Sequence, residues 1–146
     1  MPNAAQSITI ETPLDFAYRM ITNYDAYPRM FPSMTAAAVE EDQGEFKVVS
    51  YQLSLFRMTF NYRLRLTETP PFKLTWSLLD SSFFMNLDGS WQFEPLGEAQ
   101  TLATYTQTVK TKSLVPKSIS TSLASICLPS MLRQFKECCE TSYRQG

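Results

Sequence analysis

The sequence predicts an α+β fold in which a curved antiparallel sheet of about six or seven strands wraps around a long C-terminal helix. In residues 116–143, apolar side chains recur at steps of three and four, which is typical of a helix with one buried face. Between residues 34 and 109, runs of alternating apolar and polar residues are separated by short turns, as in an antiparallel meander. The apolar face of the helix needs a cover, and the apolar side of the sheet can provide it.

The composition is typical of one globular domain over residues 1–146. Hydrophobic residues make up 44%, charged residues 18% and aromatic residues 13% of the chain, which is ample for a core or for the wall of an apolar pocket. The net charge of −1 gives no basic field that would attract nucleic acid. Residues 1–7 lack the features of a signal peptide, and no segment has the roughly 20 apolar residues that span a bilayer, so we expect a cytoplasmic protein.

The chain contains no histidine, which is the commonest general base and the commonest zinc ligand. Its three cysteines, Cys127, Cys138 and Cys139, fall in the predicted last helix without C-x-x-C spacing. The aspartates lie at predicted caps, turns or outward positions, which argues against a catalytic carboxylate pair. We therefore predict no catalytic residue, no metal and no cofactor.

The N-terminal third is predicted to hold one strand and two short helices. Residues 5–11 alternate and predict a half-buried strand. Thr12 can cap the helix that follows, with Pro13 at its first position. Residues 24–32 are rich in aromatic residues and contain two prolines, which favours a helical turn that ends before Pro32.

Six further runs predict strands at residues 34–41, 46–53, 58–66, 72–78, 85–93 and 101–109. The alternation changes phase between Val48 and Val49, which indicates either a β-bulge or a strand buried on both faces. In the run 58–66 the period of two is clear, with apolar residues on one face only. In the run 85–93, the same spacing places Met85 on the face of Leu87 and Trp91.

The last helix is predicted to begin at Pro116 and to bend at Pro129, since apolar spacing resumes after that proline. Between Lys117 and Arg133 it carries no charge. Two interpretations remain open: its outer face meets a membrane or protein transiently, or the helix is packed on more than one side.

Three local motifs resemble the START-like polyketide cyclase and coenzyme Q-binding family. Residues 23–32 read N-Y-D-A-Y-P-R-M-F-P, residues 89–95 read G-S-W-Q-F-E-P, and residues 115–116 are Val-Pro before the last helix. The resemblance extends from Ser7 to about Glu140 and implies the helix-grip fold. It also implies a cavity between the sheet and the last helix.

If that cavity exists, it should be lined by the inward-pointing residues of the strands and by the apolar face of the last helix. The predicted pocket residues are Phe60, Tyr62, Leu64, Trp76, Leu78, Trp91, Phe93, Tyr105, Leu123, Ile126, Cys127 and Met131. Tyr27 and Phe31 are predicted at the entrance. Tyr62 and Tyr105 are the candidates for a polar contact with a ligand, because a buried phenol needs a hydrogen-bond partner. Alternatively, the aromatic side chains fill the space themselves.

Three function classes follow from the resemblance. The first is a non-enzymatic carrier of a small hydrophobic molecule such as a lipid, an isoprenoid quinone or a polyketide. The second is a cyclase or dehydratase, and the third is a protein- or ribosome-interaction module like the ribosome-association toxin. The third would use Arg57, Arg63 and Arg65, which share the outward face, although such rows are usually solvated and paired with carboxylates. Nucleic acid is expected as a partner only through the ribosome.

Overall fold

The computed structural model of the chain describes residues 4–55, 57–113, 116–118 and 127–145. Seven strands form one antiparallel sheet in the order β1-β7-β6-β5-β4-β3-β2. The strands are β1 (Ala4–Ile10), β2 (Met34–Asp42), β3 (Phe46–Leu55), β4 (Met58–Thr69), β5 (Lys73–Ser81), β6 (Phe84–Gly97) and β7 (Gln100–Thr111). The helical elements are α1 (Leu14–Ile21), the 3-10 turn η1 (Tyr24–Ala26), α2 (Tyr27–Met30) and α4 (Cys127–Gln145).

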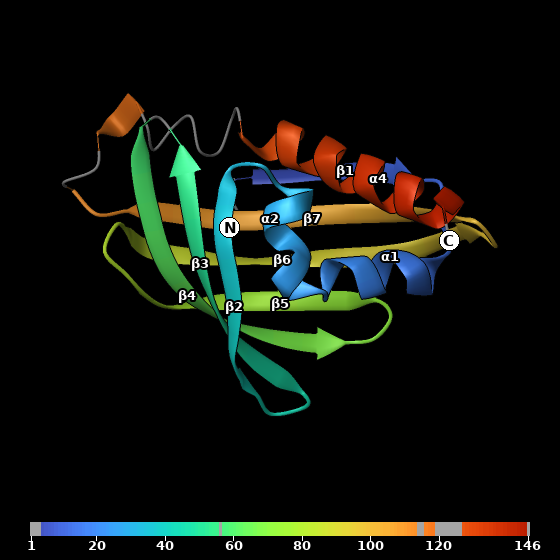
Figure 1. The fold of residues 1–146 in the computed structure, drawn as a ribbon, viewed down its shortest axis with the longest axis horizontal. Coiled ribbons are helices and arrows are strands. Elements are labelled where there is room, and N and C mark those ends of the chain that lie inside the picture. The colour runs from blue at the N-terminus through green and yellow to red at the C-terminus, as the bar shows by residue number, and fades with distance from the viewer. Residues whose placement is uncertain (1–3, 56, 114–115, 119–126, 146) are drawn as a thin grey trace.

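Figure 1 shows the curved sheet with α1, α2 and α4 on one side of it, and α4 running alongside β1. The α+β helix-grip fold, with short helices after the first strand and a long helix at the end, is thereby confirmed. The predicted start of the last helix lies largely outside the described residues, and α4 is seen from Cys127 onward.

The N-terminus of α1 differs from the prediction. Pro13 occupies the N-cap position, and no side chain caps the helix. Thr12 is fully buried, and its hydroxyl has no hydrogen-bond partner among the described residues, so it does not act as the cap. The backbone carbonyl of Thr12 instead accepts a hydrogen bond of 2.8 Å from the Thr101 hydroxyl, which fixes the start of α1 to β7.

Met85 is also placed differently from the prediction. It is 58% exposed, whereas its neighbour Phe84 is buried. The cause is a register shift between Phe84 and Asn86 in the pairing of β6 with β7, because one extra residue reverses the faces of the side chains that precede it. Leu87 and Trp91 keep their predicted inward positions.

The phase change at Val48 and Val49 has a related origin. Both side chains are buried, as expected for a strand covered on two faces. The β-bulge lies in the partner strand, where the pairing of β2 with β3 shifts between Val39 and Glu41. The phase change in the sequence of β3 thus coincides with a β-bulge in the neighbouring strand β2.

The C-terminal part of α4 is fixed to β1 and α1. Its inward side chains Leu132, Phe135 and Cys139 are fully buried. The Lys136 ammonium donates to the Thr9 carbonyl oxygen at 2.7 Å and also pairs with the Glu140 carboxylate. The Glu140 carboxylate in turn accepts a hydrogen bond of 2.9 Å from the backbone N–H of Glu11. This end of the helix therefore rests on the sheet through both apolar and polar contacts.

Candidate ligand cavity

A cavity of about 380 Å³ lies between the concave face of the sheet, α2 and the first turns of α4. It is within the range of about 300 to 1,000 Å³ that small-molecule sites occupy. Its walls come from strands β3 to β7, the segment 27–34 and the helix residues 130–134. The described lining residues are Ile21, Tyr27, Phe31, Ser33, Met34, Tyr51, Leu53, Tyr62, Leu64, Leu66, Trp76, Phe84, Leu87, Trp91, Tyr105, Gln107, Val109, Ser130, Met131 and Gln134.

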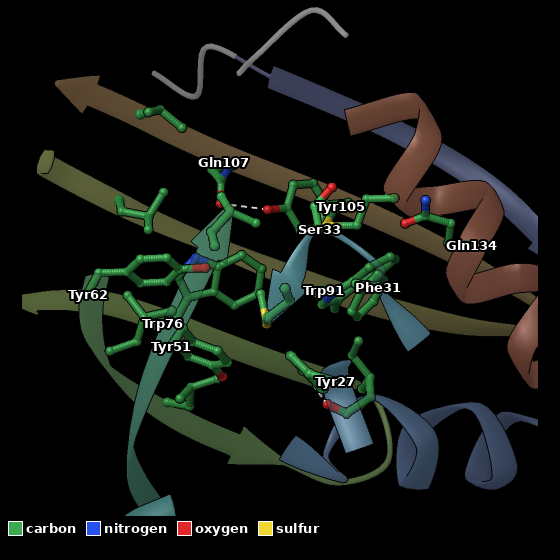
Figure 2. A pocket seen from close by; sticks show the side chains of 18 of the residues that line it. Tyr27, Phe31, Ser33, Tyr51, Tyr62, Trp76, Trp91, Tyr105, Gln107 and Gln134 are labelled. Carbon is green, nitrogen blue, oxygen red and sulfur yellow. Dashed lines mark hydrogen bonds between the residues drawn. The ribbon is translucent and has the colours of Figure 1, made fainter. Parts of the chain in front are cut away.

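One side of the cavity is formed by three tyrosine rings, Tyr27, Tyr51 and Tyr62, which we call the tyrosine wall. Tyr51 and Tyr62 are partners across β3 and β4, and their rings stack with centroids 5.3 Å apart. The ring of Tyr27 from α2 lies 5.7 Å from that of Tyr51. Figure 2 shows Tyr51 and Tyr62 side by side on the strands. This wall thus joins the sheet to the segment after the first strand.

Trp76, Trp91 and Tyr105 on the central strands form a second aromatic group, which we call the tryptophan wall. The Tyr105 ring centroid lies 5.4 Å from that of Trp76 and 5.0 Å from that of Trp91. Behind it, Phe135 of α4 contacts Trp91 at 5.0 Å between centroids, so the helix closes the cavity at that end. Gly89 permits this arrangement, because a Cβ atom there would lie 2.7 Å from the Trp76 ring.

The hydroxyls of these tyrosines differ in their hydrogen bonding. The Tyr27 hydroxyl donates to the Ile21 carbonyl oxygen at 2.5 Å, and the Tyr105 hydroxyl donates to Gln107 Oε1 at 2.5 Å (Figure 2). The hydroxyls of Tyr51 and Tyr62 have no hydrogen-bond partner within the described parts of the chain. These two groups are therefore available to whatever occupies the cavity.

The described lining of the cavity is uncharged. None of the described lining residues is Asp, Glu, Lys or Arg. Burial raises the pKa of Tyr62, and burial together with the neighbouring phenols raises the pKa of Tyr51, Tyr27 and Tyr105. All four hydroxyls are therefore protonated at neutral pH and can donate hydrogen bonds.

Most of the described residues predicted for the pocket do face the cavity. Its lining includes Tyr62, Leu64, Trp76, Trp91, Tyr105 and Met131, together with the predicted entrance residues Tyr27 and Phe31. Leu123 and Ile126 lie outside the described residues, as does the side chain of Cys127. That these residues contact a ligand remains a prediction.

Phe60, Leu78 and Phe93 were predicted for the pocket but do not line the cavity. Phe60 is fully buried against Phe83, with ring centroids 5.0 Å apart, and belongs to the core. Phe93 stacks on Trp91 behind the tryptophan wall, with centroids 5.8 Å apart. Leu78 is half-buried, next to the register shift between β4 and β5. The alternation of residues along a strand predicts which side chains point inward. It does not tell which of these belong to the core and which line the cavity.

Tyr51, Gln107, Ser33 and Gln134 line the cavity but were not predicted. Tyr51 lies just after the phase change in β3, which obscured its face. Gln107 shares the parity of Tyr105 and Val109, and this parity was the available signal. No pattern singled out Ser33 and Gln134, because they are polar residues in a turn and in a helix.

In the predicted basic row, the charge of Arg63 is compensated by carboxylates. Arg63 pairs with the carboxylates of Glu40 at 2.8 Å and Asp80 at 2.5 Å, and both carboxylates raise its pKa. The guanidinium of Arg65 lies over the Phe46 ring, 4.0 Å from its centroid. Arg57 is exposed in the turn before β4, with a φ of 62°. The two carboxylates thus compensate one of the three positive charges that the ribosome hypothesis would use.

Two further types of feature are absent from the described residues. Within ranges 4–55, 57–113, 116–118 and 127–145, no three His, Cys, Asp or Glu side chains are grouped so that they could hold a metal ion. None of the helices in these ranges has both the length and the apolar character to cross a membrane.

The fold is shared with several solved proteins. The Zhui aromatase/cyclase from Streptomyces sp. R1128 superimposes with a TM-score of 0.83 at 12% identity, over 97% of this chain and 93% of that one. A START superfamily protein from Mycobacterium smegmatis gives a TM-score of 0.83 at 14% identity, over 94% and 97% of the two chains. A protein from Thermus thermophilus gives a TM-score of 0.85 at 14% identity, over 95% and 97%. At these identities the likeness establishes the fold alone.

None of the curated proteins compared with the chain matches its sequence. The sequence profile of the family described as polyketide cyclase / dehydrase and lipid transport matches residues 10–136. That range contains all seven strands except most of β1, and it ends inside α4. The profile and the START-like neighbours agree with the three motifs noted in the sequence, and the chain is a member of the polyketide cyclase / dehydrase and lipid transport family.

Proposed function

We propose that the protein binds a small hydrophobic molecule in the cavity without chemically changing it. The observation that supports this most directly is the size and lining of the cavity, which is about 380 Å³ and mainly aromatic and aliphatic. A dry void of that size would cost on the order of 9 kcal/mol, comparable with a whole domain's stability of about 5 to 15 kcal/mol. The cavity is therefore filled by water or by a ligand.

A ligand has an advantage over water in this space. The cavity could hold roughly a dozen water molecules at the volume each takes in the liquid. Few of them could make several hydrogen bonds to walls formed by groups such as Leu64, Leu87 and Trp91. An apolar molecule would release this water and gain about 25 cal/mol for each Å² of apolar surface that it buries.

The test is native mass spectrometry of freshly purified protein, with extraction and identification of any bound compound. Trp76 and Trp91 are the chain's two tryptophans and both line the cavity, so their fluorescence reports its occupancy directly. Titration with lipids and quinones should change this fluorescence. Absence of both a bound species and any fluorescence response would refute the proposal.

A matched pair of variants connects any binding to the cavity. Leu64→Phe combined with Leu87→Phe adds two rings to its lining and should weaken binding. Leu79→Phe makes the same type of change at a side chain that is 46% exposed and outside the lining, so it should leave binding unchanged. Equal binding by all variants would place the ligand elsewhere.

The second candidate is a cyclase or dehydratase that folds a poly-β-ketone chain in the same cavity. It is favoured by the family description and by the fold shared with the Zhui aromatase/cyclase. Proton transfer would rely on tyrosine hydroxyls such as those of Tyr62 and Tyr105, since carboxylates and ammonium groups are missing from the described lining. Product formation that persists in the Tyr62→Phe and Tyr105→Phe variants would exclude this role for them.

A further inference from the structure

Two neighbouring hydroxyls on the tyrosine wall lack hydrogen-bond partners among the described residues. Tyr51 is 4% and Tyr62 is 8% exposed, both line the cavity, and their hydroxyls make no hydrogen bond to any described residue. The contrast with Tyr27 and Tyr105 is informative. Those two tyrosines line the same cavity, yet each donates to a protein oxygen at 2.5 Å.

Buried polar groups in folded proteins are nearly always hydrogen-bonded, because an unmade hydrogen bond lowers stability. Tyr51 and Tyr62 come from adjacent strands, their rings stack, and both side chains line the cavity (Figure 2). Because no described residue satisfies them, we infer that the contents of the cavity do so. Burial raises the pKa of both phenols, so each presents a proton to that group at neutral pH.

The charge of the lining restricts the ligand further. A carboxylate or ammonium group would lose its hydration on entering, and the described lining offers no opposite charge in return. A neutral oxygen loses much less hydration and can accept hydrogen bonds from both hydroxyls. The carbonyl oxygens of ketones and esters meet these requirements.

Resting on the proposed function, we propose that the ligand is an uncharged molecule with a carbonyl-type oxygen that accepts hydrogen bonds from the hydroxyls of Tyr51 and Tyr62. The remaining, apolar part of the ligand lies against the tryptophan wall. The two phenols thereby select for a neutral acceptor oxygen, whereas the rest of the cavity selects for shape and apolar surface.

Three probes with the same seven-carbon tail separate these effects. Nonan-2-one carries a ketone oxygen, 2-methylnon-1-ene replaces that oxygen with a CH₂ group of similar shape, and octanoate carries a charged carboxylate. Binding is measured through the fluorescence of Trp76 and Trp91, which none of the probes absorbs. At pH 7 we expect nonan-2-one to bind at least about tenfold more tightly than octanoate.

The variants test the two hydroxyls directly. Tyr51→Phe combined with Tyr62→Phe should weaken nonan-2-one about tenfold and change 2-methylnon-1-ene by less than about twofold. Tyr18→Phe is the matched control, because its hydroxyl donates to the Lys73 carbonyl oxygen outside the cavity lining and should affect neither probe.

The outcomes separate this inference from the proposed function. If ketone and alkene both bind and the double variant weakens them equally or not at all, the role of the hydroxyls is refuted while hydrophobic binding stands. Octanoate binding as tight as that of nonan-2-one would refute the preference for uncharged ligands. Failure of all three probes to bind, together with ligand-free native mass spectra, would overturn both proposals.

Discussion

Replacing Tyr27 with phenylalanine should lower the free energy of unfolding, whereas the same change at Tyr51 or Tyr62 should not. The Tyr27 hydroxyl is buried and donates to the Ile21 carbonyl oxygen at the end of α1. Its removal leaves a buried acceptor without a partner, which costs about 1 to 3 kcal/mol. For a chain of this size, that is roughly 4 °C of melting temperature per kcal/mol. Removing a hydroxyl that has no partner in the described part of the chain should change stability by less than about 0.5 kcal/mol.

The measurement is urea denaturation of protein that has first been unfolded and refolded, so that any bound ligand is removed. Equal m-values for all variants would show that they expose the same surface on unfolding. The decisive quantity is the difference between the loss of unfolding free energy in Tyr27→Phe and the loss in Tyr51→Phe or Tyr62→Phe. If Tyr51→Phe or Tyr62→Phe destabilises the ligand-free protein as much as Tyr27→Phe does, that hydroxyl has a partner within the protein. The inference about the ligand oxygen would then lose its basis.

Three further predictions concern the sheet and the last helix. Gly89→Ala should destabilise the protein by about 1 to 3 kcal/mol in urea denaturation, because the new Cβ would collide with the Thr106 carbonyl oxygen; an unchanged midpoint would contradict this packing. Burial opposes ionisation of Glu140, but the Lys136 ammonium and the Glu11 N–H outweigh it and lower the pKa from 4.5. Stability should therefore be lost as the pH falls below about 4.5, and Glu140→Gln should reduce that loss in melting curves at successive pH values. Burial raises the pKa of the Cys139 thiol, so with the other two cysteines replaced by serine it should react with a disulfide reagent only as fast as the protein unfolds.

The order of elements could be predicted because it depends on periodicity. A strand with one buried face repeats every two residues, and the run 58–66 shows this in its sequence and in the burial of β4. The register shifts are different, because they depend on how two strands pair. Met85 follows the inward spacing in sequence but is exposed, since the shift in the pairing of β6 with β7 comes directly after Phe84.

The cavity residues could be predicted only in part, for a similar reason. Parity placed Tyr62, Trp76 and Tyr105 on the concave face, where they line the cavity. It could not exclude Phe93, whose ring packs against that of Phe135 in α4 instead of facing the cavity. Parity alone also did not single out Gln107, a polar residue whose inward position is explained by the hydrogen bond from Tyr105. Such tertiary contacts are not visible in the spacing of residues.

The two aromatic walls limit how far the side chains that line the cavity can move. A tyrosine ring turns about only two side-chain bonds, and Tyr51 and Tyr62 are further confined by stacking on each other. The walls of the cavity should therefore lose little conformational entropy when a ligand replaces the water. Most of the conformational entropy lost on binding is then lost by the ligand. A rigid ligand should therefore bind more tightly than a flexible one of equal apolar area.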